Sequence, residues 1–76
     1  MIEVFKTNIR NVTQARKLIR DIRRVFTAYE ANVDLDDCDR ILRIETWHEN
    51  IEINCLIDLL QTHGVHAVVL EDVVPS

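Results

Sequence analysis

The side chains that could bind a metal ion or act as a nucleophile are few in this sequence of 76 residues. They are two cysteines and three histidines: Cys38, Cys55, His48, His63 and His66. No pair of them has the short, repeated spacing of a zinc or redox motif. Neither cysteine has a histidine placed beside it that could act as its general base. The sequence therefore predicts no enzyme, no catalytic residue, no resident metal site and no cofactor.

Two weaker arrangements of metal donors are present. His63 and His66 lie on either side of Gly64, but two imidazoles make an incomplete site, so weak binding of a divalent metal stays open. Residues 36–39, Asp-Asp-Cys-Asp, offer hard oxygen donors. This run lacks the length and the glycine of an EF-hand loop, so we expect a solvent-exposed turn.

Length and composition indicate one small globular domain covering residues 1–76. Apolar residues make up 47% of the chain and charged residues 29%, which is typical of a folded, soluble protein. No apolar run approaches the roughly 20 residues that span a membrane. The first residues do not resemble a secretory signal, and two cysteines make no disulfide framework. We therefore expect a cytoplasmic protein with no membrane contact.

The charges are unevenly distributed along the chain. The formal net charge is −4, from 9 lysines and arginines against 13 acids, which argues against general nucleic-acid binding. Seven of the nine basic residues lie within residues 1–30, and ten of the 13 acids follow them. Two interpretations stay open: internal pairing that aids solubility, or a basic face that docks an acidic partner or associates head to tail with a second copy.

Hydrophobic periodicity predicts the elements that position these residues. Alternation with a period of two indicates strands at residues 2–7, 29–35, 40–47 and 66–70. Helical spacing indicates helices at residues 12–26 and about 51–63, the second ended by Gly64. The order β-α-β-β-α-β predicts an α+β, ferredoxin-like fold, in which a four-stranded antiparallel sheet carries both helices on one face.

The first predicted helix is amphipathic. Asn11 and Gln14 have the spacing of an N-cap and its partner at the third helical position. Apolar residues follow on one side of the helix: Val12, Ala15, Leu18, Ile19, Ile22, Val25 and Phe26. The opposite side is basic and is a candidate interface: Arg16, Arg20, Arg23 and Arg24.

Two apolar surfaces are further candidate interfaces. The sheet leaves one face uncovered, and alternation predicts Phe5, Ile41 and Trp47 on or near it among the charged residues Glu3, Arg43 and Glu45. Three residues repeat every four positions on the outer side of the second helix: Ile51, Cys55 and Leu59. Either surface could bind a partner, although a domain this small cannot hide every apolar group. Short edge strands make a homodimer a further expectation.

From Ile2 to about Leu70, the order of elements resembles the heavy-metal-associated domain, the family of small copper chaperones and of metal-binding modules in P-type ATPases. In that family the first strand runs into the motif M-x-C-x-x-C at the start of the first helix. Here Lys6 stands at the methionine position, and Asn8 and Asn11 stand at the two cysteine positions. Cu(I) is held by thiolate sulfur, which amide groups do not replace. The resemblance therefore implies the fold and not the copper activity.

The loop that replaces the metal motif could instead attract an anion. A helix N-terminus is electropositive, and nearby cations would add to it. The residues in question are Lys6, Asn8, Arg10, Asn11 and His66. The other interpretation stays open, namely that the two asparagines cap a turn and a helix while the cations are solvated.

The RNA-recognition module shares this strand order, but it needs aromatic residues on its central strands. Phe5 is a partial match, and the strand at residues 40–45 has none, so we expect no nucleic-acid partner. The leading hypothesis is a non-enzymatic binding or regulatory module that acts through contacts with a partner protein or a second copy of itself. The alternative is binding of a small ligand, either an anion or a divalent metal, by the loop between the first strand and the first helix.

Overall fold

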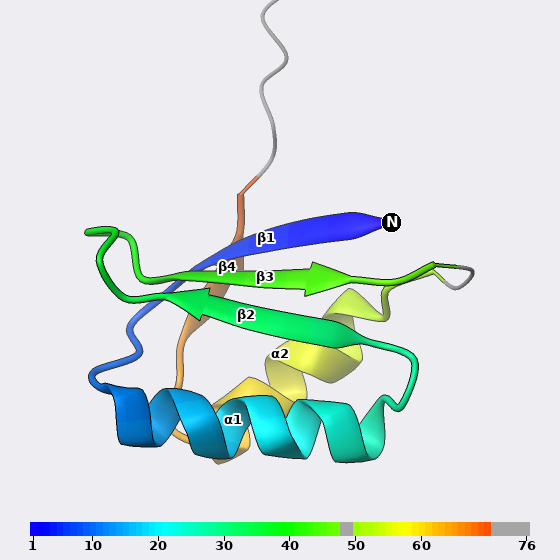
Figure 1. Ribbon diagram of the computed structural model, residues 1–76, viewed down its shortest axis with the longest axis horizontal. Helices are drawn as coiled ribbons and strands as arrows, with labels where there is room; N and C mark the ends of the chain where they lie inside the picture. Colours follow the sequence, from blue (N-terminus) through cyan, green and yellow to red (C-terminus); the bar gives the residue numbers. More distant parts are fainter. Residues whose placement is uncertain (48–49, 71–76) are drawn as a thin grey trace, which may run out of the picture.

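The computed structural model describes residues 1–47 and 50–70 (Figure 1). It has six elements: β1 (Ile2–Thr7), α1 (Val12–Val25), β2 (Glu30–Asp34), β3 (Ile41–Glu45), α2 (Ile53–Thr62) and β4 (Ala67–Val69). The strands form one antiparallel sheet in the order β2-β3-β1-β4, and both helices lie on the same side of it (Figure 1). This is the ferredoxin-like α+β fold that the sequence predicts. Within the described residues, neither helix is long and apolar enough to cross a membrane.

The core lies between the sheet and the two helices. Its fully buried members from the strands include Leu42 and Ile44, and the helices contribute four more: Leu18, Ile22, Leu56 and Leu60. Val12 and Val25, which the helical pattern places on the apolar side of α1, are instead more than half exposed. They are the first and last residues of α1, and the buried residues of this helix lie between them, at Ala15, Leu18 and Ile22.

The prediction that Phe5 lies on the uncovered face of the sheet is wrong. Phe5 is paired with Leu42 on one side and Val69 on the other, and it is fully buried against the helices. Glu3 lies on the same face as Phe5, near the start of β1, because side chains alternate along a strand. The predicted alternation along β1 is therefore correct, but the face predicted to be uncovered is the one that packs against the helices. Burying the aromatic ring of Phe5 removes more apolar surface from water than burying Ile2, which is 53% exposed.

The predicted apolar stripe on the outside of α2 is also wrong. Ile51 is only 8% exposed and belongs to the core, and Leu59 is half-buried and packs against it. Cys55 alone of the three is exposed. The reason is that α2 begins at Ile53, so position 51 precedes the helix and does not share its spacing.

Tyr29 explains how the chain before α2 is fixed. Its hydroxyl accepts a hydrogen bond from the backbone N–H of Glu52 at 2.8 Å and donates one to the carbonyl of Asn50 at 3.3 Å. The ring stacks on Phe26, with 4.7 Å between the ring centroids. These contacts join the end of α1 to the start of α2 and hold the segment between Asn50 and Glu52 against the core.

Candidate functional site

The loop between β1 and α1 holds Asn8 and Asn11, the residues that the resemblance described above aligns with two metal ligands. The Asn8 side-chain oxygen accepts a hydrogen bond from the backbone N–H of His66 at 2.7 Å. The backbone N–H of Asn8 donates to the carbonyl of the same residue at 3.3 Å. Asn8 therefore holds the loop against the chain that enters β4.

Asn11 is the N-cap of α1, as the sequence predicts. Its side-chain oxygen accepts from the backbone N–H of Gln14 at 2.8 Å, and the Gln14 side-chain oxygen accepts from the backbone N–H of Arg10 at 2.7 Å. These two bonds satisfy backbone donors at the start of the helix. Asn11, like Asn8, thus uses its side chain to hold the backbone.

The cations of this loop differ in their surroundings. The Lys6 ammonium lies 3.4 Å from a carboxylate oxygen of Asp39, in the turn between β2 and β3. The Thr7 hydroxyl, which is buried, donates a hydrogen bond to the carbonyl of Arg40 in the same turn. Arg10 is exposed, and its carbonyl accepts a bond from the Arg40 guanidinium at 3.4 Å. A carboxylate of the chain itself therefore already lies beside one cation of the proposed anion site, and small-ligand binding there stays a prediction.

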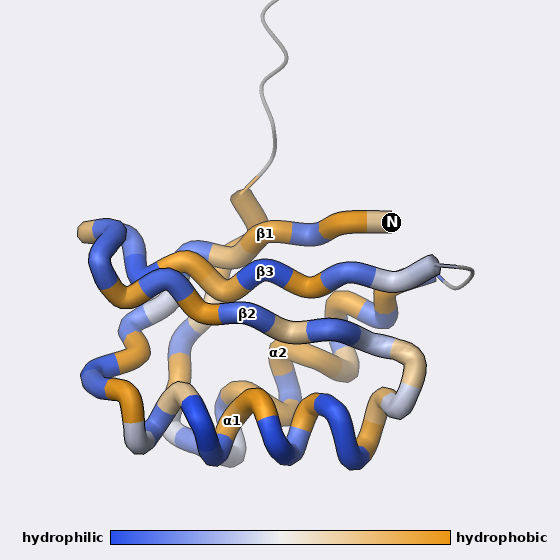
Figure 2. Tube along the Cα trace, in the orientation of Figure 1, coloured by the Kyte–Doolittle hydropathy of each residue, from blue (hydrophilic) through white to orange (hydrophobic). Residues whose placement is uncertain are grey.

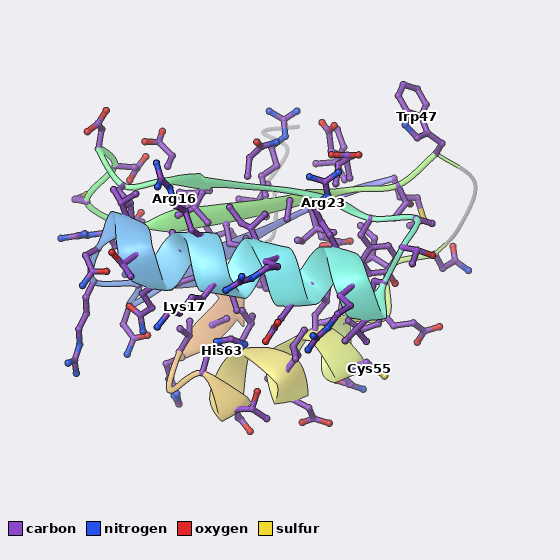
Figure 3. The ribbon with its side chains drawn as sticks, turned by 60° about the horizontal axis from the view of Figure 1, so that its bottom comes forward. Arg16, Lys17, Arg23, Trp47, Cys55 and His63 are labelled. Carbon is purple, nitrogen blue, oxygen red and sulfur yellow. The ribbon has the colours of Figure 1, made fainter. Side chains whose placement is uncertain are left out.

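His63 is engaged on the helix side of the molecule. Its Nε2 lies 2.7 Å from a carboxylate oxygen of Asp21, so this pair joins the end of α2 to α1. Figure 3 shows His63 between the two helices. Among residues 1–47 and 50–70, no hydroxyl or thiol is hydrogen-bonded to His63. The divalent-metal hypothesis for His63 and His66 also stays a prediction. In the same part of the chain, one group of three donors could surround an ion, namely the turn residues Asp37 and Cys38, which are exposed, and Asp39, which is half-buried.

The uncovered side of the sheet, called the open face below, carries outward apolar side chains that the sequence analysis missed. The missed residues are Ile2, Val4 and Val68, of which Ile2 is 53% and Val68 58% exposed. Ile41 lies on the same face, as the sequence predicts. Figure 2 shows apolar and polar residues alternating along β1 and β3. The signal was available, since alternation puts Ile2 opposite to Phe5, but the pattern alone does not tell which face the helices cover.

Trp47 lies just beyond β3 and is 85% exposed, which agrees with its prediction as a surface residue. In Figure 3 its ring points away from the helices. A hollow of about 240 Å³ is lined by Trp47 and Ile2, among others. A second hollow, of about 860 Å³, has Ile2, Val4 and Ile41 among its lining residues. Because Ile2 lines both hollows, Trp47 is continuous with the open face.

The outer side of α1 is basic, as the sequence predicts. Four of its cations are exposed and have no ion pair within the described residues: Arg16, Lys17, Arg20 and Arg23. Arg24 differs, since it lies 3.5 Å from Asp21. Figure 3 shows Arg16 and Arg23 on one flank of the helix and Lys17 on the other. A hollow of about 630 Å³, called the arginine hollow below, is lined by Arg16, Ile19, Arg20, Arg23, Arg24 and Thr27.

Comparison with protein-family models finds no matching family, and comparison with curated protein sequences finds no match. A solved structure does match: the solution structure of the yeast copper transporter domain CCC2A in the apo and Cu(I)-loaded states. The TM-score is 0.75, and the match covers 93% of this chain and 96% of that one at 8% sequence identity. The two proteins thus share a fold. At this identity the likeness extends to the fold alone.

Proposed function

We propose that the chain is a non-enzymatic binding or regulatory module that acts through contacts with a partner protein, and that the open face with Trp47 is its contact surface. One observation carries the proposal: three large apolar side chains, Ile2, Trp47 and Val68, are each more than half exposed on or beside one uncovered face. Exposed apolar side chains gathered on one face mark interaction sites more often than isolated apolar residues do.

The composition of the open face supports a protein partner. Tryptophan is enriched among the residues that contribute most to protein interfaces. Charged residues lie among the apolar ones, with the Arg43 guanidinium 3.0 Å from a carboxylate oxygen of Glu45. An apolar centre with a polar surround is the usual anatomy of a non-obligate interface.

Other features bear on the class and location of the protein. Within the described residues, His63 is occupied by Asp21 and activates no nucleophile, which supports a non-enzymatic role. Cys38 and Cys55 are both free and exposed. We place the module in the cytoplasm, where exposed thiols would stay reduced.

The proposal is tested by two pairs of matched substitutions. Ile2→Ser with Val68→Ser removes apolar surface from the open face. Val12→Ser with Val25→Ser removes residues that are 54% and 58% exposed at the two ends of α1, so it controls for the loss of exposed apolar surface elsewhere. Each chain is used to capture proteins from an extract of its source cells, with quantitative mass spectrometry. We expect a partner that the wild type and the α1 variant recover and the open-face variant does not.

The recovered partner is then purified and added to the wild-type chain. Trp47 is the one tryptophan of the sequence, so its fluorescence reports on the open face directly. We expect the emission to shift to shorter wavelength as the ring leaves water. If no protein's recovery depends on Ile2 and Val68, or if the purified partner leaves the emission unchanged, the open face is not the contact surface and the proposal is wrong.

A further inference from the structure

The arginine hollow is a concentration of positive charge that the described part of the chain does not neutralise. Arg16 and Arg20 are four positions apart on α1, as are Arg20 and Arg24, so like charges face each other along the helix. Such spacing is unfavourable in an isolated helix. Of these three arginines, Arg24 alone has an ion pair within residues 1–47 and 50–70. An external group with negative charge would relieve this repulsion.

The residues that line the hollow indicate which kind of group could bind there. Ile19 is half-buried and lines it together with the exposed residues Arg16, Arg20 and Arg23. Because an apolar residue lies among cations, this lining favours a binding partner that combines negative charge with a small apolar side chain. A short acidic turn is such a partner. The apolar residues in the middle of α1 face the core, so this helix cannot enter a bilayer as an amphipathic helix does.

A turn of this chemistry exists in the chain itself, between β2 and β3. Asp36, Asp37 and Cys38, called the acidic tip below, are all exposed. Asp36 and Asp37 have no ion pair within the described residues, whereas Asp39 pairs with Lys6. A free cysteine behaves as a small apolar residue.

The acidic tip is also held in one shape. The Asp34 side chain accepts a hydrogen bond from the backbone N–H of Asp36 at 3.0 Å, and the Asp37 side chain accepts one from that of Asp39 at 2.9 Å. Arg40 closes the turn with a φ of 48° and donates its N–H to the carbonyl of Asp37 at 3.0 Å. A turn that is ordered before binding loses little conformational entropy on docking.

We propose that the acidic tip of one copy docks in the arginine hollow of a second copy. The tip projects at one end of the sheet, whereas α1 lies in the helix layer (Figure 1), so the two surfaces belong to different parts of the molecule. The contact is head to tail, because the two copies contribute different surfaces. It involves neither Trp47 nor the open face, so it is independent of the partner contact proposed above.

The contact is weak and sensitive to salt, because it joins exposed charges. In sedimentation velocity at low salt, we expect the average mass of the wild-type chain to rise as its concentration approaches about 1 mM. Salt at about 1 M, where the Debye length is about 3 Å, should return the chain to monomer.

Charge reversal tests the pairing of the two surfaces. Arg20→Glu with Arg23→Glu reverses the hollow, and Asp36→Lys with Asp37→Lys reverses the tip. Each pair should weaken self-association by about tenfold or more. The chain with all four substitutions should associate again, since a basic tip then meets an acidic hollow. All six positions changed here or in the control are outside the core, and circular dichroism checks that each variant is folded.

The control is Lys17→Glu with Arg43→Glu, which changes the net charge as much as reversal of the hollow does but leaves the hollow intact. This variant should associate as the wild type does. Three results would each overturn the proposal: a monomeric wild type at every concentration in low salt, a control as impaired as the hollow variant, or no recovery in the fourfold variant. Association lost with Ile2→Ser and Val68→Ser would assign it to the open face and overturn it as well.

Discussion

The loop between β1 and α1 and the outer side of α1 are adjacent in the sequence and opposite in character. In the loop, the polar side chains of Asn8 and Asn11 each hold a backbone N–H of the same chain. On the outer side of α1, Arg16, Arg20 and Arg23 have no ion pair within residues 1–47 and 50–70. Asn8 and Asn11 therefore serve the fold, whereas the cations of α1, which have no ion pair within the described residues, are better candidates for binding.

The two faces of β1 differ in a similar way, since one serves the fold and the other is exposed. Phe5 and Thr7 point toward the helices and are buried, whereas Ile2 lies on the open face and is largely exposed. A substitution on the inner face should therefore cost stability, and one on the outer face should cost binding.

Phe5→Ala should lower the free energy of unfolding by about 3–5 kcal/mol, because it leaves a cavity at a fully buried position. Ile2→Ala, on the other face of the same strand, should change it by less than about 1 kcal/mol. Urea denaturation followed by circular dichroism measures both. Similar losses in the two variants would contradict the assignment of the faces.

Thr7→Val should cost about 1–3 kcal/mol, since the isosteric change leaves the Arg40 carbonyl and the Ile9 N–H without the Thr7 hydroxyl. Thr13→Val makes the same chemical change at an exposed position of α1 and should cost less than about 0.5 kcal/mol. The same denaturation experiment serves here. Equal effects at the two threonines would show that the buried hydroxyl does not hold β1 to the β2–β3 turn.

Asn11→Ala should cost about 1 kcal/mol, because the N-cap bond to the Gln14 N–H is lost. Asn11→Ser keeps an oxygen that can accept this bond, so most of the stability should return. Thermal unfolding of the three chains gives the comparison. An alanine variant as stable as the wild type would mean that Asn11 is free for another role.

Arg20→Gln should have the smallest effect and should be slightly stabilising, by about 0.2–0.5 kcal/mol, because it removes repulsion from Arg16 and Arg24. Thermal unfolding at low salt, where the repulsion is least screened, is the measurement. A loss above about 1 kcal/mol would indicate that Arg20 has a structural partner, and the outer side of α1 would no longer contrast with the loop.

The sequence predicts the fold because each element has its own local pattern. The alternation of β1 and the Asn11–Gln14 cap are both expressed within a few residues, and both are confirmed. The face on which Phe5 lies depends on which side the helices cover, which alternation does not encode. Ile51 was misplaced for a related reason, since the helical pattern was extended beyond the start of α2.

The candidate site was less predictable than the fold. The sequence correctly identified the basic side of α1 and the exposure of Trp47. The bond between Asn8 and His66 joins residues 58 positions apart, and the bond between Asp21 and His63 joins residues 42 positions apart. No short-range pattern specifies such contacts. They depend on how the packed elements meet, and they decide which polar groups remain available for ligands.

If the β1–α1 loop serves the fold and binding belongs to the surfaces, residues 6–12 should not take up Cu(I). Cu(I) titration of the reduced chain, monitored by amide chemical shifts of residues 6–12, tests it most directly. Cys38→Ser with Cys55→Ser removes the two exposed thiols, and a further variant adding Asn8→Cys and Asn11→Cys supplies the thiolates that Cu(I) prefers. We expect the loop shifts to change only in the variant with the added cysteines. Stoichiometric, tight uptake of Cu(I) at residues 6–12 of the chain without the added cysteines would show that this loop is a metal site.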